Sequence, residues 1–372
     1  MNRIHQDAPT ALRDQGVDRS NRDFSEFDQV NKPQQYRLSE AADGSEPFDT
    51  DFVIKTCDMA DFFHGGDAGR QRFAEALGSA MEEIGFAILV NHGVDPALFD
   101  RADAAVVDLF ENVPQDERLA YLAQRHGSVN QGYFPIKQTT IIHPDLVEGW
   151  VFCRRAFNLT AAADFDASAY WPRAHFEPIF RELVEAEQAL VLPVMQSILR
   201  YLGCPPNLYD QRLGASNFGF RLNYYPVPEP GVVASGGRML GHEDVDLFTF
   251  LPAARIEGLQ VLNRRNMKWI RLQAPRGSII LNTGDYMQRI SNDRLPSTTH
   301  RVSQPRDPAA LATPRISTPM AVYLWEDEIL EVLPGLGEPK YPPVSAIAFH
   351  THTTAKYYGA DYAVDQDPPK PR

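Results

Sequence analysis

Two histidines and one aspartate carry the most specific chemical signal in this sequence. His242 and Asp244 lie two residues apart, at the start of an apolar and aromatic stretch that ends at Pro252. This composition predicts a strand, and side chains two residues apart on a strand share a face. An imidazole beside a carboxylate is costly to bury without a partner, and a divalent metal is the simplest one. Because two protein ligands are too few, we expect a third from another strand.

The best candidate for the third ligand is His300, which follows Asp244 after several predicted strands. Two histidines and one carboxylate on one side of a metal leave the opposite positions open, an arrangement typical of non-haem Fe(II) oxygenases. The three-residue His-x-Asp pattern alone is more typical of an ordinary polar turn. The prediction of a metal site therefore depends on the residues that accompany it.

Two further pairs with the same spacing could bind an organic acid beside the metal. Asn223 and Tyr225 lie upstream of the His-x-Asp stretch, and Arg315 and Ser317 lie downstream of His300. If both stretches are strands, the two residues of each pair share a face. A guanidinium beside a hydroxyl is a good receptor for a carboxylate, because arginine binds it through two parallel hydrogen bonds and serine adds another. For Arg315 alone, a structural ion pair is the more ordinary explanation.

The order of the motifs resembles the isopenicillin N synthase-like branch of the Fe(II)/2-oxoglutarate-dependent oxygenases, from about residue 50 to about residue 325. The N-terminal part of the resemblance is Ile-Gly-Phe at 84–86 and Val-Asn-His-Gly-Val at 90–94. The remaining motifs are Asn-Tyr-Tyr-Pro at 223–226, His-x-Asp at 242–244, Glu-Gly-Leu-Gln-Val at 257–261, Trp-Ile at 269–270, Asn-Thr-Gly-Asp at 282–285, His-Arg-Val at 300–302 and Arg-x-Ser at 315–317.

The resemblance implies a fold class and a metal. The expected fold is mainly β with flanking helices: a double-stranded β-helix (jelly roll) core with an N-terminal helical region. Fe(II) is expected inside the open end of the roll. Its implied ligands are His242, Asp244 and His300.

The resemblance also implies 2-oxoglutarate and dioxygen as cosubstrates. Arg315 and Ser317 would bind the far carboxylate of 2-oxoglutarate, supported by Tyr225 and Asn223. The products would be succinate, carbon dioxide and an oxidised small molecule. Hydroxylation is the default outcome, and desaturation or cyclisation are alternatives. Two rival hypotheses are an Fe(II) oxidase of the same fold that does not use 2-oxoglutarate and a metal-bound sensor without turnover.

Three aromatic residues are candidates for contact with the primary substrate: Tyr133, Phe248 and Tyr323. Tyr133 lies in the stretch 125–150, which glycines and prolines interrupt, and irregular stretches of this length often form functional lids. Packing of the lid or of the core explains each of the three residues equally well. Phe218 is a further candidate for shaping the pocket, and core packing explains it equally well, whereas packing is the favoured explanation for Phe152 and Arg154.

Periodic patterns predict the helices that flank the roll. Apolar positions over 68–84 predict an amphipathic helix that ends at Gly85. Asp95, followed by a proline, predicts the start of a second helix, with the aspartate as its N-cap. The stretch 173–202 predicts one long helix, which Pro193 should kink.

Many short strands separated by turns are predicted from about residue 213 onward, a pattern typical of a sandwich or jelly roll. A hairpin is expected around residues 263–266, and a turn is expected at 283–285. Pro305, Pro308 and Pro314 predict an extended loop between His300 and Arg315. Pro319 would remove a ladder hydrogen bond from the following strand unless it lies at an edge or a bulge.

The predicted organisation has four parts. Residues 1–48 are polar and are expected to form a flexible N-terminal extension. We expect an N-terminal helical region with lid loops over 49–210 and the double-stranded β-helix catalytic core over 211–331. C-terminal loops and a helical tail are expected over 332–372. His92 is interpreted as a structural histidine in a turn, because the resemblance implies iron ligands elsewhere. His350 and His352 are assigned no metal, because no carboxylate accompanies them.

Composition limits the choice of partners and compartment. The 372 residues carry 36 basic and 49 acidic side chains, a formal net charge of −13, which disfavours binding to nucleic acid. No run approaches the roughly 20 apolar residues of a membrane span, and the N-terminus has no apolar core typical of a signal peptide. Three widely spaced cysteines indicate a reducing compartment. We therefore expect a cytoplasmic enzyme with a small-molecule substrate, and the oligomeric state is left open.

Overall fold

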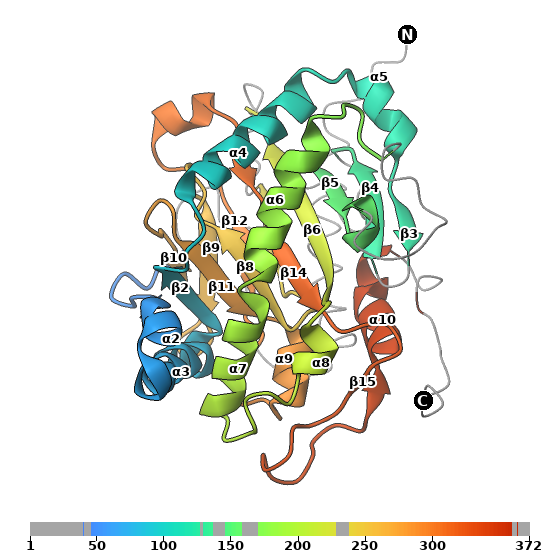
Figure 1. The fold of residues 1–372 in the computed structure, drawn as a ribbon. Coiled ribbons are helices and arrows are strands. Elements are labelled where there is room, and N and C mark those ends of the chain that lie inside the picture. Colours follow the sequence, from blue (N-terminus) through green and yellow to red (C-terminus); the bar gives the residue numbers. More distant parts are fainter. Residues whose placement is uncertain are drawn as a thin grey trace.

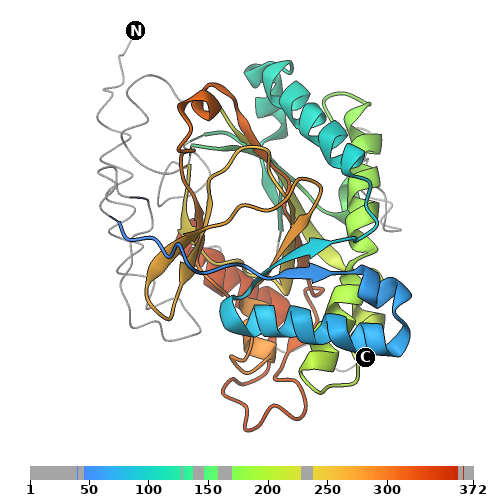
Figure 2. The ribbon, with the colours of Figure 1, turned by 90° about the vertical axis from the view of Figure 1, so that its left-hand side faces the viewer.

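The computed structural model describes residue 40, residues 46–126, 129–136, 146–157, 170–227 and 238–358, and residue 363. Most of the predicted extension 1–48 and the middle of the predicted lid, residues 137–145, lie outside these residues. Two β-sheets form the core, and helices cover the outer face of the larger sheet (Figure 1). The smaller sheet lies opposite the larger one (Figure 2). This arrangement confirms the predicted jelly roll with flanking helices.

The larger sheet contains ten strands within the described residues. All its neighbouring pairs are antiparallel except the first, β1 with β2. In spatial order its strands are β1 (Thr56–Asp58), β2 (Phe86–Val90), β11 (Ile279–Thr283), β8 (Phe248–Pro252), β14 (Met320–Tyr323), β6 (Asn217–Tyr225), β5 (Glu148–Phe152), β4 (Val129–Phe134) and β3 (Gln124–His126), and β13 (Arg315–Ser317) pairs with the end of β6.

The smaller sheet brings together segments that are far apart in the sequence. Its strands, in spatial order, are β10 (Lys268–Arg271), β9 (Leu259–Asn263), β12 (His300–Val302) and β7 (Met239–His242). Apolar side chains of both sheets, including Ile88 and Val261, form a common cluster between them. A separate pair outside both sheets is β15 (Ile329–Leu330) with β16 (Val344–Ser345).

Alternation along β6 separates the site from the helix-covered core. Phe218 and Phe220 belong to the large apolar cluster that also contains residues of the covering helices. The intervening inward-facing residues line a cavity between the sheets: Gly219, Arg221, Asn223 and Tyr225. One strand therefore carries core residues on one face and candidate site residues on the other.

The helices lie mainly before β6. Those of regular length are α3 (Gly66–Ile84), α4 (Pro96–Glu111), α6 (Phe176–Gln188), α7 (Val191–Tyr201) and α10 (Ala346–Tyr358). The short ones are α2 (Ala60–His64), α5 (Gln115–Arg118), α8 (Asp210–Leu213), α9 (Asp285–Ile290) and the 3-10 turns η1 (Leu119–Tyr121), η2 (Arg154–Phe157) and η5 (Pro308–Ala312). Within the described part of the chain, no helix combines the length and the apolarity that crossing a membrane requires.

The predicted helix ends are largely confirmed. Asp95 caps α4 by accepting a hydrogen bond from the backbone N–H of Ala97. Gly85 ends α3 in the left-handed conformation, with φ of 72°. The prediction of a single helix over 173–202 is wrong, because this stretch forms two helices, α6 and α7, separated by a turn. Pro193 lies in the first turn of α7, where its missing N–H needs no helical partner.

Several loop predictions are also corrected. Residues 125–150 contain β4 and the start of β5, which extend the larger sheet. The turn expected at 283–285 instead leads into α9, which Gly284 precedes as N-cap. Part of the loop expected after His300 forms η5. Pro319 lies between β13 and β14, so the strands break where its N–H is missing, and its carbonyl accepts from the Arg221 N–H.

Replacement of Gly85 by alanine is predicted to destabilise the junction between α3 and β2. A Cβ at this position would lie 2.4 Å from the carbonyl oxygen of Pro296, and the left-handed conformation costs a non-glycine residue about 1–2 kcal/mol. Gly93 is the matched control, because its φ is 84° and a Cβ there would meet nothing within 4 Å. In urea unfolding, we expect G85A to lose at least about twice as much free energy as G93A. Equal losses would contradict the clash.

Candidate functional site

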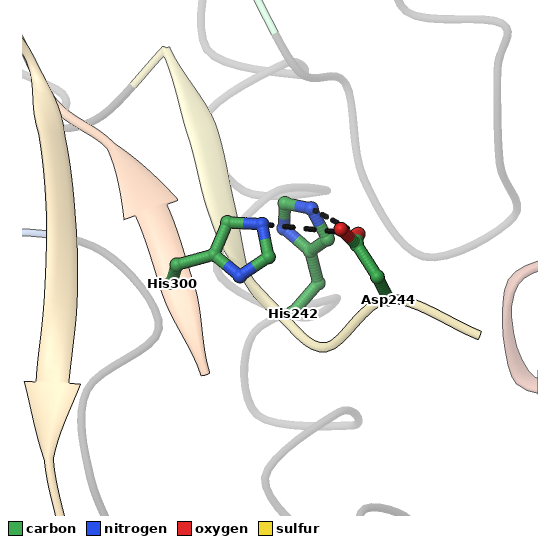
Figure 3. A group of neighbouring side chains, drawn as sticks. All are labelled: His242, Asp244 and His300. Atoms are coloured by element: carbon green, nitrogen blue, oxygen red, sulfur yellow. Dashed lines mark ion pairs between the residues drawn. The ribbon is translucent and has the colours of Figure 1, made fainter. Parts of the chain in front are cut away.

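The three predicted ligand side chains converge at one end of the smaller sheet. His242 ends β7, His300 begins β12, and the two residues face each other across the paired strands. Oδ1 of Asp244 lies 3.7 Å from Nε2 of His242 and 3.8 Å from Nε2 of His300 (Figure 3). Ligand atoms from all three residues lie within 4.8 Å of one another. This spacing fits a single metal ion.

Asp244 reaches this position from a loop, whereas the sequence predicted that it shares a strand with His242. The strand β7 stops at His242, and β8 begins at Phe248. The buried backbone of the intervening loop is tied to the neighbouring turn, because the carbonyl of Asp244 accepts from the N–H of Asp285 at 2.8 Å. The shared direction of the two side chains therefore does not come from strand alternation.

Backbone carbonyls orient both imidazoles. Nδ1 of His242 lies 2.8 Å from the carbonyl oxygen of Leu240, and Nδ1 of His300 lies 3.1 Å from that of Thr298. Because a carbonyl can only accept, each Nδ1 carries the ring proton. Each Nε2 therefore presents a lone pair toward Asp244, as metal-ligating histidines do.

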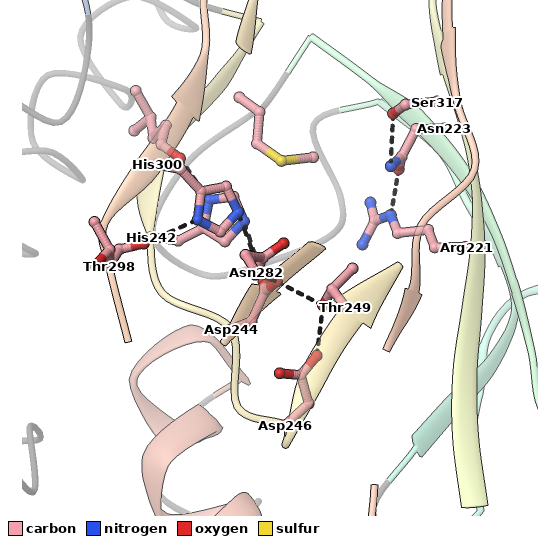
Figure 4. A network of polar contacts seen from close by, with 12 residues as sticks. Arg221, Asn223, His242, Asp244, Asp246, Thr249, Asn282, Thr298, His300 and Ser317 are labelled. Carbon is pink, nitrogen blue, oxygen red and sulfur yellow. Dashed lines mark hydrogen bonds and ion pairs between the residues drawn. The ribbon is translucent and has the colours of Figure 1, made fainter. Parts of the chain in front are cut away.

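Two hydrogen bonds similarly leave one oxygen of Asp244 available. Its Oδ2 accepts from Oγ1 of Thr249 and from Nδ2 of Asn282, both at 2.8 Å (Figure 4). Burial raises the pKa of Asp244, whereas positive charge on the two imidazoles, when they are protonated, and the hydrogen bonds from Asn282 and Thr249 lower it, and the net direction is below its usual value. The carboxylate is thus ionised, and its free Oδ1 faces the histidines.

Thr249 also contacts a fully buried second carboxyl. Its Oγ1 lies 2.5 Å from Oδ2 of Asp246, and burial, assisted by the charge of Asp244, raises the pKa of Asp246 well above its usual value. The protonated carboxyl of Asp246 donates a hydrogen bond to Oγ1 of Thr249. The single hydroxyl proton of Thr249 is then donated in a hydrogen bond to Oδ2 of Asp244. The three residues form a directed chain of hydrogen bonds that fixes the carboxylate.

The second group of predicted residues lies where β13 pairs with β6. Arg315 is opposite Tyr225, and Ser317 is opposite Asn223. Nδ2 of Asn223 donates to Oγ of Ser317 at 3.3 Å, so the hydroxyl proton of Ser317 remains available. The strand assignment made from the i, i+2 spacing is confirmed for both pairs.

Arg315 is buried with an unsatisfied donor. Its side chain is 2% exposed, and its Nε donates to the carbonyl of Ile256 at 3.2 Å. Nη1 has no hydrogen-bond partner, and no ion pair of Arg315 is found within the described ranges. Burial lowers the pKa of the guanidinium. A buried charge of this kind costs several kcal/mol, by order of magnitude, unless an anion joins it.

A second buried guanidinium strengthens the positive potential at this end. Arg238 is 1% exposed; its Nε donates to Gln304 at 3.0 Å, while Nη1 and Nη2 have no partner. Burial, followed by repulsion from Arg315, lowers the pKa of Arg238 to about 10. Two neighbouring buried cations with unsatisfied donors favour an anionic ligand.

One cavity of about 310 Å³ connects the two groups. The three converging side chains and Arg315 contribute to its wall, as do Ser317 and Tyr225. The remaining wall is largely apolar and includes Val129, Phe134 and Tyr323. The cavity thus combines three side chains suited to hold a metal, a basic end suited to an anion and an apolar region.

Of the three aromatic substrate candidates, only Tyr323 lines the cavity. Tyr133 faces the other side of β4, and its hydroxyl donates to Glu148. The side chain of Thr249 points into the cavity, so the neighbouring Phe248 points to the opposite face of β8 and is fully buried in the core. Phe152 stacks on Phe220 in that core. Side chains alternate between the two faces of each strand, and the sequence alone did not show which face turns toward the cavity. Tyr133, Phe248 and Phe152 therefore proved to lie on the other face.

The weaker candidates and the C-terminal histidines also have other environments. Arg154 hydrogen-bonds to Gln188 and Ser216, outside the cavity. His350 and His352 lie on α10 rather than on an extended segment. His350 is buried and lines the cavity, and burial lowers its pKa to about 4, whereas His352 is exposed.

Sequence reasoning missed many residues of the cavity wall, among them Thr249, Asn282 and Arg221. Thr249 and Asn282 orient Asp244, and no spacing rule connects them with it. Arg221 could have been found, since it precedes Asn223 by two residues and therefore shares the inward face of β6.

A jelly roll with two histidines and a carboxylate beside a buried anion-binding arginine defines a non-haem Fe(II) oxygenase. Two family models match the chain: the N-terminal region of a non-haem dioxygenase in morphine synthesis over residues 54–174, and the 2OG-Fe(II) oxygenase superfamily over residues 216–320. The chain belongs to the 2OG-Fe(II) oxygenase superfamily.

Known proteins agree with this membership. Feruloyl CoA ortho-hydroxylase 1 of Arabidopsis thaliana is 27% identical over 292 residues, which cover 77% of this chain and 74% of that protein. The 2-oxoglutarate-Fe(II) type oxidoreductase ppzD of Metarhizium rileyi is 25% identical, covering 83% of this chain and 92% of its own. A Neurospora crassa structure in complex with alpha-KG and thymine shares the fold, with a TM-score of 0.73, 23% identity and coverage of 85% and 100%.

The protein is therefore an Fe(II)- and 2-oxoglutarate-dependent dioxygenase, with O2 as the other cosubstrate. This membership favours the predicted reaction over the two rival hypotheses, the oxidase that does not use 2-oxoglutarate and the sensor without turnover.

Removal of the Arg315 charge is predicted to leave the cofactor-free protein at least as stable as the wild type. Arg315→Met removes a buried charge that lacks an anion and also relieves its repulsion of Arg238. Arg301→Met is the matched control, because Arg301 is equally buried but pairs with Glu46 at 2.6 Å. Breaking that pair should cost about 3–5 kcal/mol. Urea unfolding of both variants measures the difference. Similar losses of unfolding free energy would show that groups within the protein already compensate the charge of Arg315.

Proposed function

We propose that this enzyme hydroxylates a small molecule at an Fe(II) centre, with release of succinate and carbon dioxide. In this proposal the iron ligands are His242, Asp244 and His300. The proposed 2-oxoglutarate-binding residues are Arg315, Ser317, Tyr225 and Asn223.

The observation that carries the ligand assignment is the convergence of one donor atom from each of the three side chains. Carbonyl oxygens fix the protonated nitrogens of both imidazoles, and Thr249 and Asn282 occupy the second oxygen of Asp244. The remaining lone pairs face a common point, and no cationic side chain pairs with Asp244 in the described part of the chain. Such a donor set supports a metal with open positions on the cavity side.

The proposed cosubstrate site matches a dicarboxylate. Arg315 offers an unsatisfied Nη1, and Ser317 offers a hydroxyl proton, so both can donate to one carboxylate. The ring of Tyr225 lies 5.0 Å from Cζ of Arg315 and restricts the guanidinium from the side. Bound iron would supply the positions at which the keto acid and dioxygen react and the oxidant that removes a hydrogen atom from the substrate. The cavity wall holds the substrate and limits the entry of water.

The apolar region around Phe134 and Tyr323 is the proposed location of the primary substrate. Relatives named for oxidation of feruloyl CoA or auxin support a small-molecule substrate. The acidic net charge supports the same choice over nucleic acid. Cys57, Cys153 and Cys204 are buried and form no disulfide among the described residues, which supports the expected cytoplasmic location.

The test is oxygen-dependent formation of succinate from 2-oxoglutarate by the Fe(II)-loaded protein. Without the primary substrate, we expect slow uncoupled turnover, and D244A should reduce it at least about 100-fold, since loss of outer-shell partners alone costs 10–100-fold. The control is H175A, because His175 is exposed on the far side of the helices and pairs with Asp108. Succinate formation that is absent from the wild type, or unchanged in D244A, would contradict the assignment.

The hydrogen bonds to Asp244 should contribute to metal affinity. N282A and T249V each remove one donor to Oδ2, and we expect each to weaken binding of Mn(II), a redox-stable probe of the site, by about 10–100-fold. N112A is the control, because Asn112 donates to an exposed aspartate at 2.7 Å outside the cavity. Calorimetric titration measures the affinities. Wild-type affinity in both site variants would show that Asp244 needs no such orientation.

A further inference from the structure

Besides Arg315, a second guanidinium lines the cavity, that of Arg221, and it has no role in the proposed binding of iron or 2-oxoglutarate. Arg221 lies on the inward face of β6 between Gly219 and Asn223, and its side chain is only partly exposed. No acidic side chain pairs with it among the residues that the structure describes. A cation without an acidic partner in a largely apolar wall is costly, and a ligand of opposite charge would offset that cost.

Contacts on three sides fix the direction of this guanidinium. Nε donates to Oδ1 of Asn223 at 2.5 Å, and Cζ lies 5.4 Å from the ring centre of Phe134. Gly149 leaves room on the neighbouring strand, because a Cβ there would lie 3.0 Å from Nη2. Figure 4 shows the guanidinium directed into the space between β6 and the side chains around Asp244. Both terminal nitrogens therefore remain available, and they form the fork that binds a carboxylate through two hydrogen bonds.

Arg221 is distinct from the proposed 2-oxoglutarate end. Arg315 pairs with Tyr225 in the β6–β13 register, and Tyr225 lies four residues beyond Arg221, roughly 13 Å along the strand at 3.3 Å per residue. Asn223 lies between them and bonds to both sides, accepting from Arg221 and donating to Ser317. A single carboxylate held at Arg315 and Ser317 therefore leaves Arg221 without an anion.

The surroundings of Arg221 describe the rest of the ligand. Val129, Phe134 and Val151 form an apolar cluster against which Tyr323 packs, and all four residues line the cavity. These side chains provide contact area for an apolar or aromatic body but few hydrogen bonds. The wall thus combines one carboxylate-binding fork with an apolar surface.

We propose that Arg221 binds a carboxylate of the primary substrate, and that the enzyme oxidises a small organic acid with an apolar or aromatic body. This inference rests on the proposed function, because it requires the 2-oxoglutarate carboxylate to lie at Arg315. It names a substrate-binding residue and the chemical class that the residue selects.

The experiment compares acids with their uncharged counterparts on the Mn(II)-loaded protein with 2-oxoglutarate bound, which does not turn over. The probes are phenylacetate, 3-phenylpropionate, cinnamate and hexanoate, each paired with its primary amide, and the readout is the dissociation constant from calorimetry. We expect at least one acid to bind at least 10-fold more tightly than its amide. R221M should weaken binding of that acid about 10–100-fold, as loss of a charge-assisted hydrogen-bonded pair does, and should leave the amide unchanged. R221K should retain part of the preference.

Two further variants separate this role from a structural one. R212M removes a half-buried arginine that pairs with Glu328 at 2.6 Å outside the cavity, and it should change neither acid nor amide binding. G149A keeps Arg221 but places a methyl group against its guanidinium, so acid affinity should fall in the same direction. This second variant serves the test even if R221M does not fold.

The outcomes that overturn the inference are specific. It is wrong if no acid binds more tightly than its amide, or if R221M weakens the acid and the amide equally. It is also wrong if R221M weakens 2-oxoglutarate binding as much as it weakens binding of the acid, because Arg221 would then serve the cosubstrate. Failure of the wild type to bind Mn(II) and 2-oxoglutarate, measured before any acid is added, would instead refute the proposed function.

Discussion

The pairing of β7 with β12 is the constraint on which the site depends. It places His242 opposite His300, and the same local geometry turns each Nδ1 toward a carbonyl two residues earlier, at Leu240 and Thr298. Backbone atoms that cannot be substituted therefore fix the protonation and the direction of both imidazoles. Asp244 only has to approach from the following loop, where side chains hold it. A metal site built this way is pre-organised by the fold, and its donor atoms do not depend on the metal to find their positions.

The same interior accepts charge that the protein alone does not neutralise. Arg301 shows that this fold can satisfy a fully buried guanidinium, since it contacts both Glu46 and Gln260. Arg315 and Arg238 are buried to the same extent but keep unsatisfied nitrogens. This difference is expected where stability is given up for ligand binding. A dicarboxylate that enters such a site gains both its own hydrogen bonds and relief of the repulsion between the two arginines.

Sequence spacing predicted the site residues that lie on strands. It failed for residues whose position depends on a loop or on the register of a strand. Asn223 with Tyr225 and Arg315 with Ser317 share strand faces as predicted, because alternation requires no tertiary information. The convergence of Asp244 with the histidines was inferred from the same rule, yet a loop supplies this residue, so the local reason for the prediction was wrong. The prediction that Tyr133 contacts substrate depended on which face of β4 turns toward the cavity, and the sequence alone does not determine that face.

The inward face of β6 explains how one scaffold can keep its cosubstrate and change its substrate. Asn223 and Tyr225 lie beside β13, where the 2-oxoglutarate end is proposed, while Gly219 and Arg221 lie beside the apolar region. The outward residues pack against helices and are constrained by the core. A substitution at 219 or 221 therefore changes the wall that faces the substrate without altering the helix packing or the β6–β13 pairing. The hydrogen bond from Arg221 to Asn223 links the two halves, so occupancy of one half can influence the geometry of the other.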